Sequence, residues 1–517
     1  MTASHVEIHP GNHVAVIGAG PGGLAAAAWL SRNGFEPVVF EAAARLGGQW
    51  NAGQPMSGTW AGMRTNTSRV LSAFSDLDHA PGTPVYPTQA EMLAYLERYA
   101  AATGISRRIR TGTPVERLER HADGGWLVTS RANGALRAER FGRVVVATGR
   151  QARPHMPEVA GIGGFTGSGG VRHSMHYQGA AAYRGLSVLV TGCSISALEI
   201  ASELAAGGAA RVSVASRRQR YVLGKLLAGI PADHLAFTRF AALAGPVTPP
   251  EMLAAGLKGF VVGTSGSPEQ FGAPQPDDNI FAAGLTQSQN YLPLVAEGRI
   301  APRPWIERVE GDTVCFTDGT SEQVDAIIMG TGYALSLPFL GRDIAEALEL
   351  DGQHVTLADH TFHPDLEGLA FIGLYDQVGP LLPVLELQAR WLSYVWSGRA
   401  AAPSRTELDE GLAASRAARN GPPQVLMHDM AVLFARRIGA EPDPRRWPDL
   451  TRALMFGPLS PASFRLEGPD RLPEAPARTR AAAAAFGAIA SNEMTPDEAA
   501  RWALIEAAAL APVGEAA

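Results

Sequence analysis

The stretch that decides the fold is VAVIGAGPGG, residues 14–23. Its first four residues are apolar, as in a buried strand, and an alanine-rich segment over residues 24–30 follows the glycines. A glycine turn between a strand and a helix lets the backbone approach a pyrophosphate, whose negative charge the helix N-terminus attracts. We therefore predict a dinucleotide site here, with candidate contacts Gly18, Gly20, Pro21, Gly22 and Gly23.

The next segment supports this prediction. A second strand is expected over residues 37–40, and it ends at Glu41. A carboxylate about 20 residues after the glycines suits the hydroxyl pair of a ribose. Glu41 is therefore a further candidate contact.

A second turn of the same kind is GCSISA, residues 192–197, after the apolar run 188–191. Ser194 replaces the middle glycine and Ala197 the last one. Small residues still permit a close approach, and the hydroxyls of Ser194 and Ser196 can donate hydrogen bonds to a phosphate. Two such turns in one chain predict two dinucleotides held face to face.

The strand after the second turn indicates which dinucleotide binds there. It is expected over residues 211–215 and is followed by Arg217 and Arg218, with no acid at the ribose position. Arginine complements a 2′-phosphate, so this pattern favours NADP over NAD. The alternative interpretation is a solvated basic strand end.

Two further apolar runs, residues 143–148 and 324–329, lie on either side of the second turn. We interpret them as the exit from a first domain and the return to it. The predicted fold is α/β, with two Rossmann-like dinucleotide-binding domains and a C-terminal helical extension. The predicted limits are 1–150 and 331–400 for the first domain, 151–330 for the inserted domain and 401–517 for the extension. Residues 1–12 are expected to be a loose lead-in and residues 241–277 to be loops.

Composition excludes several classes of function. The formal net charge of −6 gives no reason to expect nucleic acid or a membrane surface as partner. The two cysteines, Cys193 and Cys315, form no CxxC pair, which disfavours a disulfide reductase and fits a reducing cytoplasm. The sequence shows neither a signal peptide nor an apolar run long enough to span a membrane. It also lacks the Gly-x-Ser-x-Gly elbow of serine hydrolases. We expect a cytoplasmic protein.

Over roughly residues 12–400 the chain resembles the flavin-containing monooxygenases. GGQW, residues 47–50, is similar to the family's Gly-Gly-x-Trp, and FTGSGGVRHSMHY, residues 165–177, is similar to its FxGxxxHxxxY/F fingerprint. This chain has two extra residues between Gly167 and His173, which a loop extension accounts for.

The resemblance implies FAD at the first turn and NADPH at the second. It also implies oxygen activation as a C4a-hydroperoxyflavin, which oxygenates a small nucleophilic amine or sulfide. The further cofactor contacts that we assign are Gln49, Trp50, Thr65, Asn66, Val115 and Tyr177.

Asn66 is the candidate catalytic residue. It lies in RTNTSR, residues 64–69, which is similar to the family's segment that places an asparagine against the flavin. A neutral amide can donate a hydrogen bond to a peroxide or to bound NADP, whereas a carboxylate would repel the peroxide anion. The alternative interpretation is that Asn66 caps a loop.

Two rival functions share these cofactors. A Baeyer–Villiger monooxygenase usually has tryptophan at the position of Tyr177 and arginine instead of an active-site asparagine, so the sequence favours oxygenation of a heteroatom. The rival from another class is a redox sensor that binds FAD and NADPH without turnover.

The remaining expectations concern structure and partners. His173 and His176 lack a third ligand, so no metal site is predicted, and His173 is expected to bond the backbone between the domains. The extension carries no recognisable chemistry and is expected to serve packing or a homodimer contact.

Overall fold

The computed structural model describes residues 7–9, 11–421 and 424–510. Residues 1–6 and 10 of the predicted lead-in lie outside these ranges. The prediction of a loose lead-in is wrong for β1 (Glu7–Ile8), which pairs in parallel with β7 (Ala135–Phe141).

The first glycine turn belongs to a five-stranded parallel sheet with the order β23–β8–β2–β3–β4. These strands are β2 (His13–Ile17), β3 (Glu36–Phe40), β4 (Ile109–Arg110), β8 (Arg143–Val146) and β23 (Leu369–Phe371). Helix α1 (Pro21–Arg32) follows the turn and packs on α10 (Leu382–Ser397) in one buried cluster. We call this sheet and its helices the first unit.

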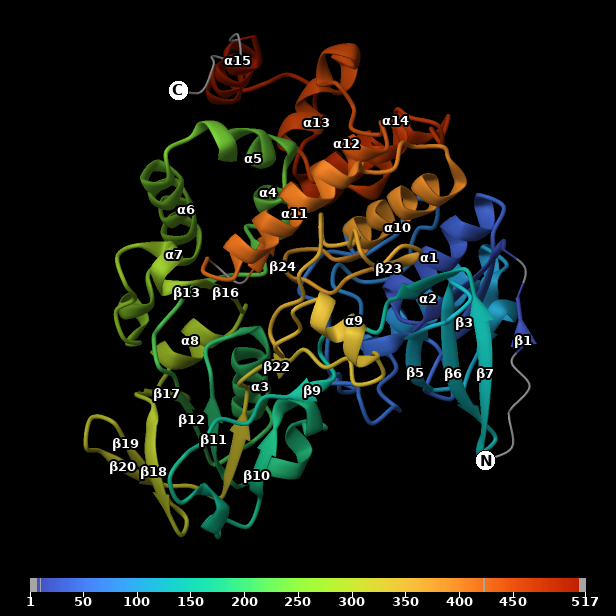
Figure 1. Ribbon diagram of the computed structural model, residues 1–517. Helices are drawn as coiled ribbons and strands as arrows, with labels where there is room; N and C mark the ends of the chain where they lie inside the picture. The colour runs from blue at the N-terminus through green and yellow to red at the C-terminus, as the bar shows by residue number, and fades with distance from the viewer. Residues whose placement is uncertain (1–6, 10, 422–423, 511–517) are drawn as a thin grey trace.

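The second turn belongs to another five-stranded parallel sheet, with the order β10–β21–β11–β12–β17. Its strands are β10 (Gly170–His173), β11 (Ser187–Thr191), β12 (Arg211–Ala215), β17 (Ile300–Arg303) and β21 (Ala326–Met329). Helices α3 (Ile195–Ala206) and α8 (Tyr291–Ala296) pack beside it. We call this the second unit. All of its strands fall between β8 and β23 in the chain, and the predicted fold class is confirmed (Figure 1). The domain limits stay a prediction.

The chain crosses between the two units at one place. β9 (Arg153–Pro154) carries it out and β22 (Tyr333–Ala334) brings it back, and the two strands pair antiparallel. The His155 amide also donates to the Gly332 carbonyl at 2.9 Å. The two crossings are therefore hydrogen-bonded to each other.

The prediction of loops over residues 241–277 is wrong for residues 241–244 and 250–265, which are helical. Residues 221–287, which we call the subdomain, contain the sixteen-residue helix α6 (Pro250–Ser265). Ala254 and Val261 of α6 are buried, and Leu257, Phe260 and Val262 pack beside them, so a helical stripe is present. Glycine disfavours helix, and the three glycines of this segment hide the stripe in the sequence. The other elements are β13 (Tyr221–Leu223), β14 (Leu226–Leu227), β15 (Ile230–Pro231), α4 (Ala232–Ala236), α5 (Arg239–Ala244), α7 (Ile280–Ala283) and β16 (Leu285–Gln287).

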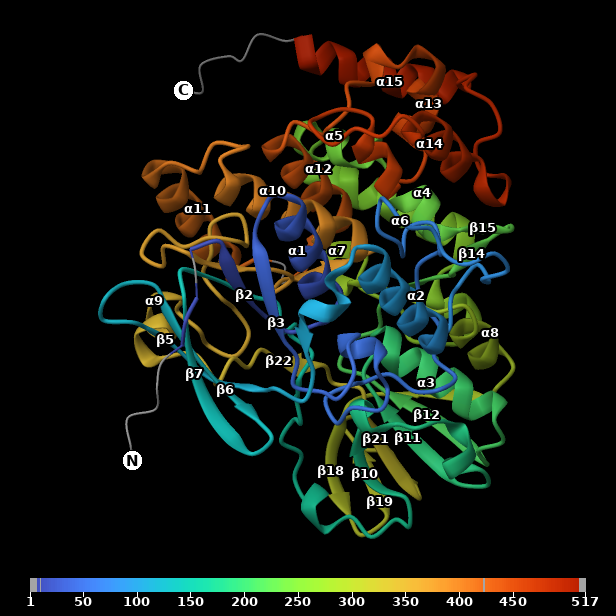
Figure 2. The same ribbon diagram turned by 90° about the vertical axis from the view of Figure 1, so that its right-hand side faces the viewer.

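The C-terminal extension is helical, and it folds back on the subdomain. The helices over residues 427–437, 451–456 and 496–510 pack on α5, and the first two lie beside it in both views (Figures 1 and 2). Its elements are α11 (Arg405–Ala418), β25 (Gln424–Leu426), α12 (Met427–Arg437), α13 (Thr451–Phe456), α14 (Ala475–Ala484) and α15 (Pro496–Leu510). No helix within the described ranges has both the length and the apolar character that a membrane crossing requires.

The remaining elements are smaller. Helix α2 (Gln89–Ala102) starts with a capping box of Thr88 and Glu91, a pattern that is visible in the sequence. A mixed sheet of order β1–β7–β6–β5 includes β5 (Val115–Arg120) and β6 (Trp126–Ala132), and an antiparallel sheet consists of β18 (Ile306–Glu310), β19 (Thr313–Phe316) and β20 (Ser321–Gln323). β24 (Asp376–Val378) pairs in parallel with β25, and α9 (Arg342–Ala347) is a short helix.

One buried ion pair joins the subdomain to the extension. Arg239, 1% exposed, donates to Glu441 Oε1 at 2.6 Å and to the Leu454 carbonyl at 2.9 Å. Replacing Glu441 with glutamine leaves a buried guanidinium incompletely paired, so we expect the free energy of unfolding in urea to fall by about 3 kcal/mol.

The matched control is Glu346→Gln. Glu346 pairs with Arg342 on the surface, with side-chain exposures of 64% and 92%, and its loss should cost about 0.5 kcal/mol or less. Equal losses in the two variants would contradict the structural importance of the Arg239 pair.

Candidate dinucleotide sites and the asparagine segment

The two glycine turns are built in the same way. Gly18 and Gly192 each have φ of +103°, a left-handed conformation that favours glycine. A Cβ on Gly18 would collide with the Ala147 carbonyl, and one on Gly192 with the Gly330 carbonyl. Each turn therefore passes against the end of the neighbouring strand with no room for a side chain. Such a bare backbone cradle at a helix N-terminus fits a pyrophosphate.

The turns differ at their last position. A Cβ on Gly23 would overlap the Gly18 carbonyl, so only glycine fits there. In the second turn Ala197 is tolerated because Gly330, opposite its Cβ, has no side chain. Ser194 and Ser196 are exposed at the start of α3, where their hydroxyls are open to a ligand.

Glu41 links the first turn to the end of β3. Its carboxylate accepts hydrogen bonds from the Ala19 amide at 2.7 Å and the Ala43 amide at 2.8 Å. Burial raises the pKa of this carboxyl, and the two backbone donors act against that rise. Glu41 thus fixes the shape of the turn. Its predicted contact with a ribose stays a prediction.

The structure brings other predicted contacts next to the first turn. Gly48, at the start of the short helix Gly48–Trp50, touches Gly20, which places Gln49 and Trp50 nearby. The Gln49 amide donates to the carbonyls of Met56 at 3.0 Å and Gln151 at 2.8 Å. Val115 begins β5, two residues after Thr113, whose amide bonds the Glu41 carbonyl at 2.8 Å.

Arg217 and Arg218 are both exposed after β12, but they are held differently. The Arg217 guanidinium stacks on the Trp305 ring at 4.7 Å. Arg218 instead donates to the Ala282 carbonyl at 2.9 Å. Trp305 follows β17, the strand beside β12, and nothing in the sequence links it to Arg217. Because Arg218 is already bonded to the backbone, we expect Arg217 to be the main contact of a 2′-phosphate.

Asn66 lies in an irregular segment, residues 63–75, and is half-buried. Next to it, Thr65 is buried and bonded at both ends, because its amide donates to the Pro87 carbonyl at 2.9 Å and its hydroxyl to the Thr67 carbonyl at 2.8 Å. Thr65 thus fixes the backbone that carries Asn66.

Tyr177 is placed as a core residue. It is 1% exposed and packs edge-on against Trp60, with ring centres 5.2 Å apart. The Trp60 indole in turn donates to Glu203 on α3 at 2.5 Å. Tyr177 therefore supports the contact between α3 and the loop that carries Trp60. Its predicted contact with a cofactor stays a prediction.

The expectation for His173 is confirmed. Its Nε2 lies 2.9 Å from the Gly332 carbonyl, and its Nδ1 accepts from the Met175 amide at 3.1 Å, so the proton is on Nε2. Burial lowers the pKa of His173 to about 4. It is therefore a neutral ring that ties β10 to the returning chain.

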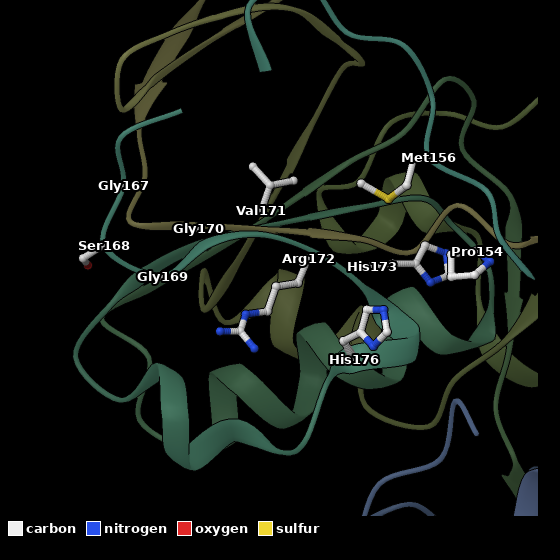
Figure 3. Close-up of a pocket in the computed structure, with 10 residues that line it drawn as sticks. All are labelled: Pro154, Met156, Gly167, Ser168, Gly169, Gly170, Val171, Arg172, His173 and His176. Carbon is white, nitrogen blue, oxygen red and sulfur yellow. The ribbon is translucent and has the colours of Figure 1, made fainter. Parts of the chain in front are cut away.

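A pocket of about 720 Å³ lies along β10 and the loop extension before it. Figure 3 shows Arg172 and His176 on one side of this strand and Val171 on the other. Neither glycine turn contributes to its lining. The pocket therefore belongs to the loop extension and not to the candidate dinucleotide sites.

A family model described as flavin-binding monooxygenase-like matches residues 11–483. The match runs further than the resemblance expected from sequence, which ended near residue 400, and so takes in most of the extension.

Individual relatives agree with this match. The chain is 30% identical over 484 residues to dimethylaniline monooxygenase (N-oxide-forming) 2 of Rattus norvegicus, covering 89% of each chain. Its fold matches S-allyl-L-cysteine S-oxygenase of Allium sativum with a TM-score of 0.62 and 25% identity, over 90% of this chain and 97% of that one. It also matches cyclohexanone monooxygenase bound to ε-caprolactone, with a TM-score of 0.64 and 18% identity over 82% and 98%.

The two arginines allow a test of the second site. We expect Arg217→Ala to raise the Michaelis constant for NADPH about tenfold or more while changing that for NADH little, because a charged hydrogen bond contributes about 1.5–3 kcal/mol. Trp305→Ala should show a smaller effect of the same selectivity.

Arg218→Ala is the matched control and should change the NADPH constant less than Arg217→Ala. An equal rise for NADPH and NADH in Arg217→Ala would reject the assignment to a 2′-phosphate.

Proposed function

The chain belongs to the flavin-binding monooxygenase-like family, and on that premise we propose that it oxygenates a small nucleophilic amine or sulfide. It is an enzyme, an oxidoreductase that uses FAD and NADPH, as the resemblance implied. The hypothesis of a sensor without turnover is therefore set aside. When bound at the first turn, FAD would supply the oxygen activation, and NADPH at the second turn would supply the reducing equivalents.

The observation that carries the proposal is the setting of Asn66. Its side chain is a neutral amide, its neighbours Thr65 and Thr67 are also neutral, and the backbone around it is fixed by hydrogen bonds. Such a group can donate a hydrogen bond without taking up or releasing a proton. The names of two relatives, one N-oxide-forming and one an S-oxygenase, support nitrogen and sulfur as the atoms oxygenated.

Baeyer–Villiger oxidation of a ketone is the competing proposal. The likeness to cyclohexanone monooxygenase concerns the fold alone, at 18% identity. Tyr177 in place of tryptophan and Asn66 in place of arginine both favour the heteroatom.

A panel of amines, sulfides and ketones, scored by product and not by NADPH loss, decides between these reactions. We expect N-oxides or sulfoxides in proportion to the NADPH consumed. Esters or lactones as the main products would overturn the proposal.

Asn66→Asp tests the role of the amide. A carboxylate repels negative charge developing on oxygen, and the loss of one such donor costs about 100-fold or more in other enzymes. We expect product per NADPH to fall at least about tenfold, while the rate of flavin reduction by NADPH changes less than about twofold.

Asn12→Asp makes the same charge change at an exposed position before β2 and should leave both rates unchanged. Unchanged coupling to product in Asn66→Asp would remove Asn66 from the mechanism.

A further inference from the structure

The asparagine segment is bonded by two consecutive residues of the subdomain. Asp233 and His234 stand in α4, directly after β15, and are only 3% and 1% exposed. Both contact Ser68, which lies two residues after Asn66 in the chain. Ser68 is itself fully buried. Two ionisable residues thus meet the segment at a point closed to solvent.

The contacts use both polar groups of Ser68. Its amide donates to Asp233 Oδ2 at 2.7 Å, and its hydroxyl lies 3.1 Å from His234 Nε2. The backbone and the side chain of one residue are therefore held by neighbouring residues of another part of the fold.

Stability alone does not explain this pair. Asp233 Oδ1 and His234 Nδ1 are buried, and neither has a partner in the described part of the chain. Each such orphaned group costs about 1–3 kcal/mol, a cost that an apolar residue of similar size would avoid. Polar residues in this setting define one position for the segment at the expense of stability.

The C-terminal extension also contacts His234. The Phe486 ring, in the short helix Ala485–Gly487, meets His234 edge-on, with ring centres 5.2 Å apart. The Arg69 guanidinium lies over the Phe486 ring, 5.0 Å from its centre. Phe486 has φ of +59°, a costly conformation for a residue other than glycine. The extension therefore holds an unfavourable backbone to keep this ring in place.

We propose that Asp233 and His234 are positioning residues, which act through Ser68 to fix Asn66 whenever the subdomain is docked on the first unit. We call the contacts of Asp233 and His234 with Ser68 the latch. Whether the latch holds residues 63–72 does not depend on which reaction the enzyme catalyses. Its consequence for oxygenation rests on the function proposed above for Asn66.

Hydrogen exchange on the full-length, FAD-loaded enzyme tests the latch directly. His234→Phe keeps an aromatic ring against Phe486 but removes the ring nitrogen that bonds Ser68, and Ser68→Ala removes the hydroxyl with little change in volume. We expect amides of residues 63–72 to exchange about three- to tenfold faster in each variant, which corresponds to the loss of one hydrogen bond.

His428→Phe is the matched control. His428 is also a buried histidine, on α12, and its ring packs at a tilt against Phe237 of the same subdomain with centres 6.0 Å apart. It should cause a comparable loss of overall stability without faster exchange in residues 63–72.

The functional readout is the fraction of consumed NADPH that gives product. We expect His234→Phe and Ser68→Ala to lower this fraction about threefold or more with flavin reduction unchanged, and the double variant to be no worse than the single ones, because both remove the same bond. A merely structural role would not separate these two steps.

The outcomes distinguish the two proposals. If residues 63–72 exchange no faster in His234→Phe and Ser68→Ala than in His428→Phe, the latch is overturned. If exchange is faster in both but the product fraction stays at the wild-type value, the latch stands and the role proposed for Asn66 fails.

Discussion

A buried segment without regular structure must find a partner for each backbone N–H, and residues 63–75 find theirs on separate parts of the fold. The Ser68 amide donates to Asp233 of the subdomain, the Phe74 amide to the Tyr95 hydroxyl on α2 at 2.7 Å, and the Ser75 amide to Glu386 on α10 at 2.7 Å. The candidate catalytic residue thus stands on a support that exists only when these parts are assembled.

The C-terminal extension is part of that support. Arg465 donates to the Ser75 hydroxyl at 2.7 Å, and Arg478 bonds the Ser75 carbonyl and Asp78. Arg465 also lies over the Trp29 ring, which Arg32 and Arg390 approach as well. A region that showed no chemistry in the sequence therefore holds the far end of the asparagine segment. The extension thus packs on the rest of the fold, as expected, and the expected homodimer contact stays a prediction.

Local patterns explain what could be predicted from the sequence. The two turns, their flanking strands and the capping box at Thr88 depend on residues close together in the chain. Two other contacts join residues that are far apart in the sequence: Trp305 with Arg217, and His234 with Ser68. Neither contact produces a periodic pattern in the sequence. Helix α6 escaped prediction for a different reason, because its glycines and the prolines at its start are typical of loops although its apolar residues have helical spacing.

The paired strands β9 and β22 have a consequence for the history of such a chain. Because the two crossings are paired strands, the chain enters and leaves the second unit at one place on the first unit. A unit whose ends meet can be gained, lost or exchanged as a block without opening the sheet that hosts it. The joint that carries the chain between the two dinucleotide sites is thus also the place where a different reductant-binding module could be grafted.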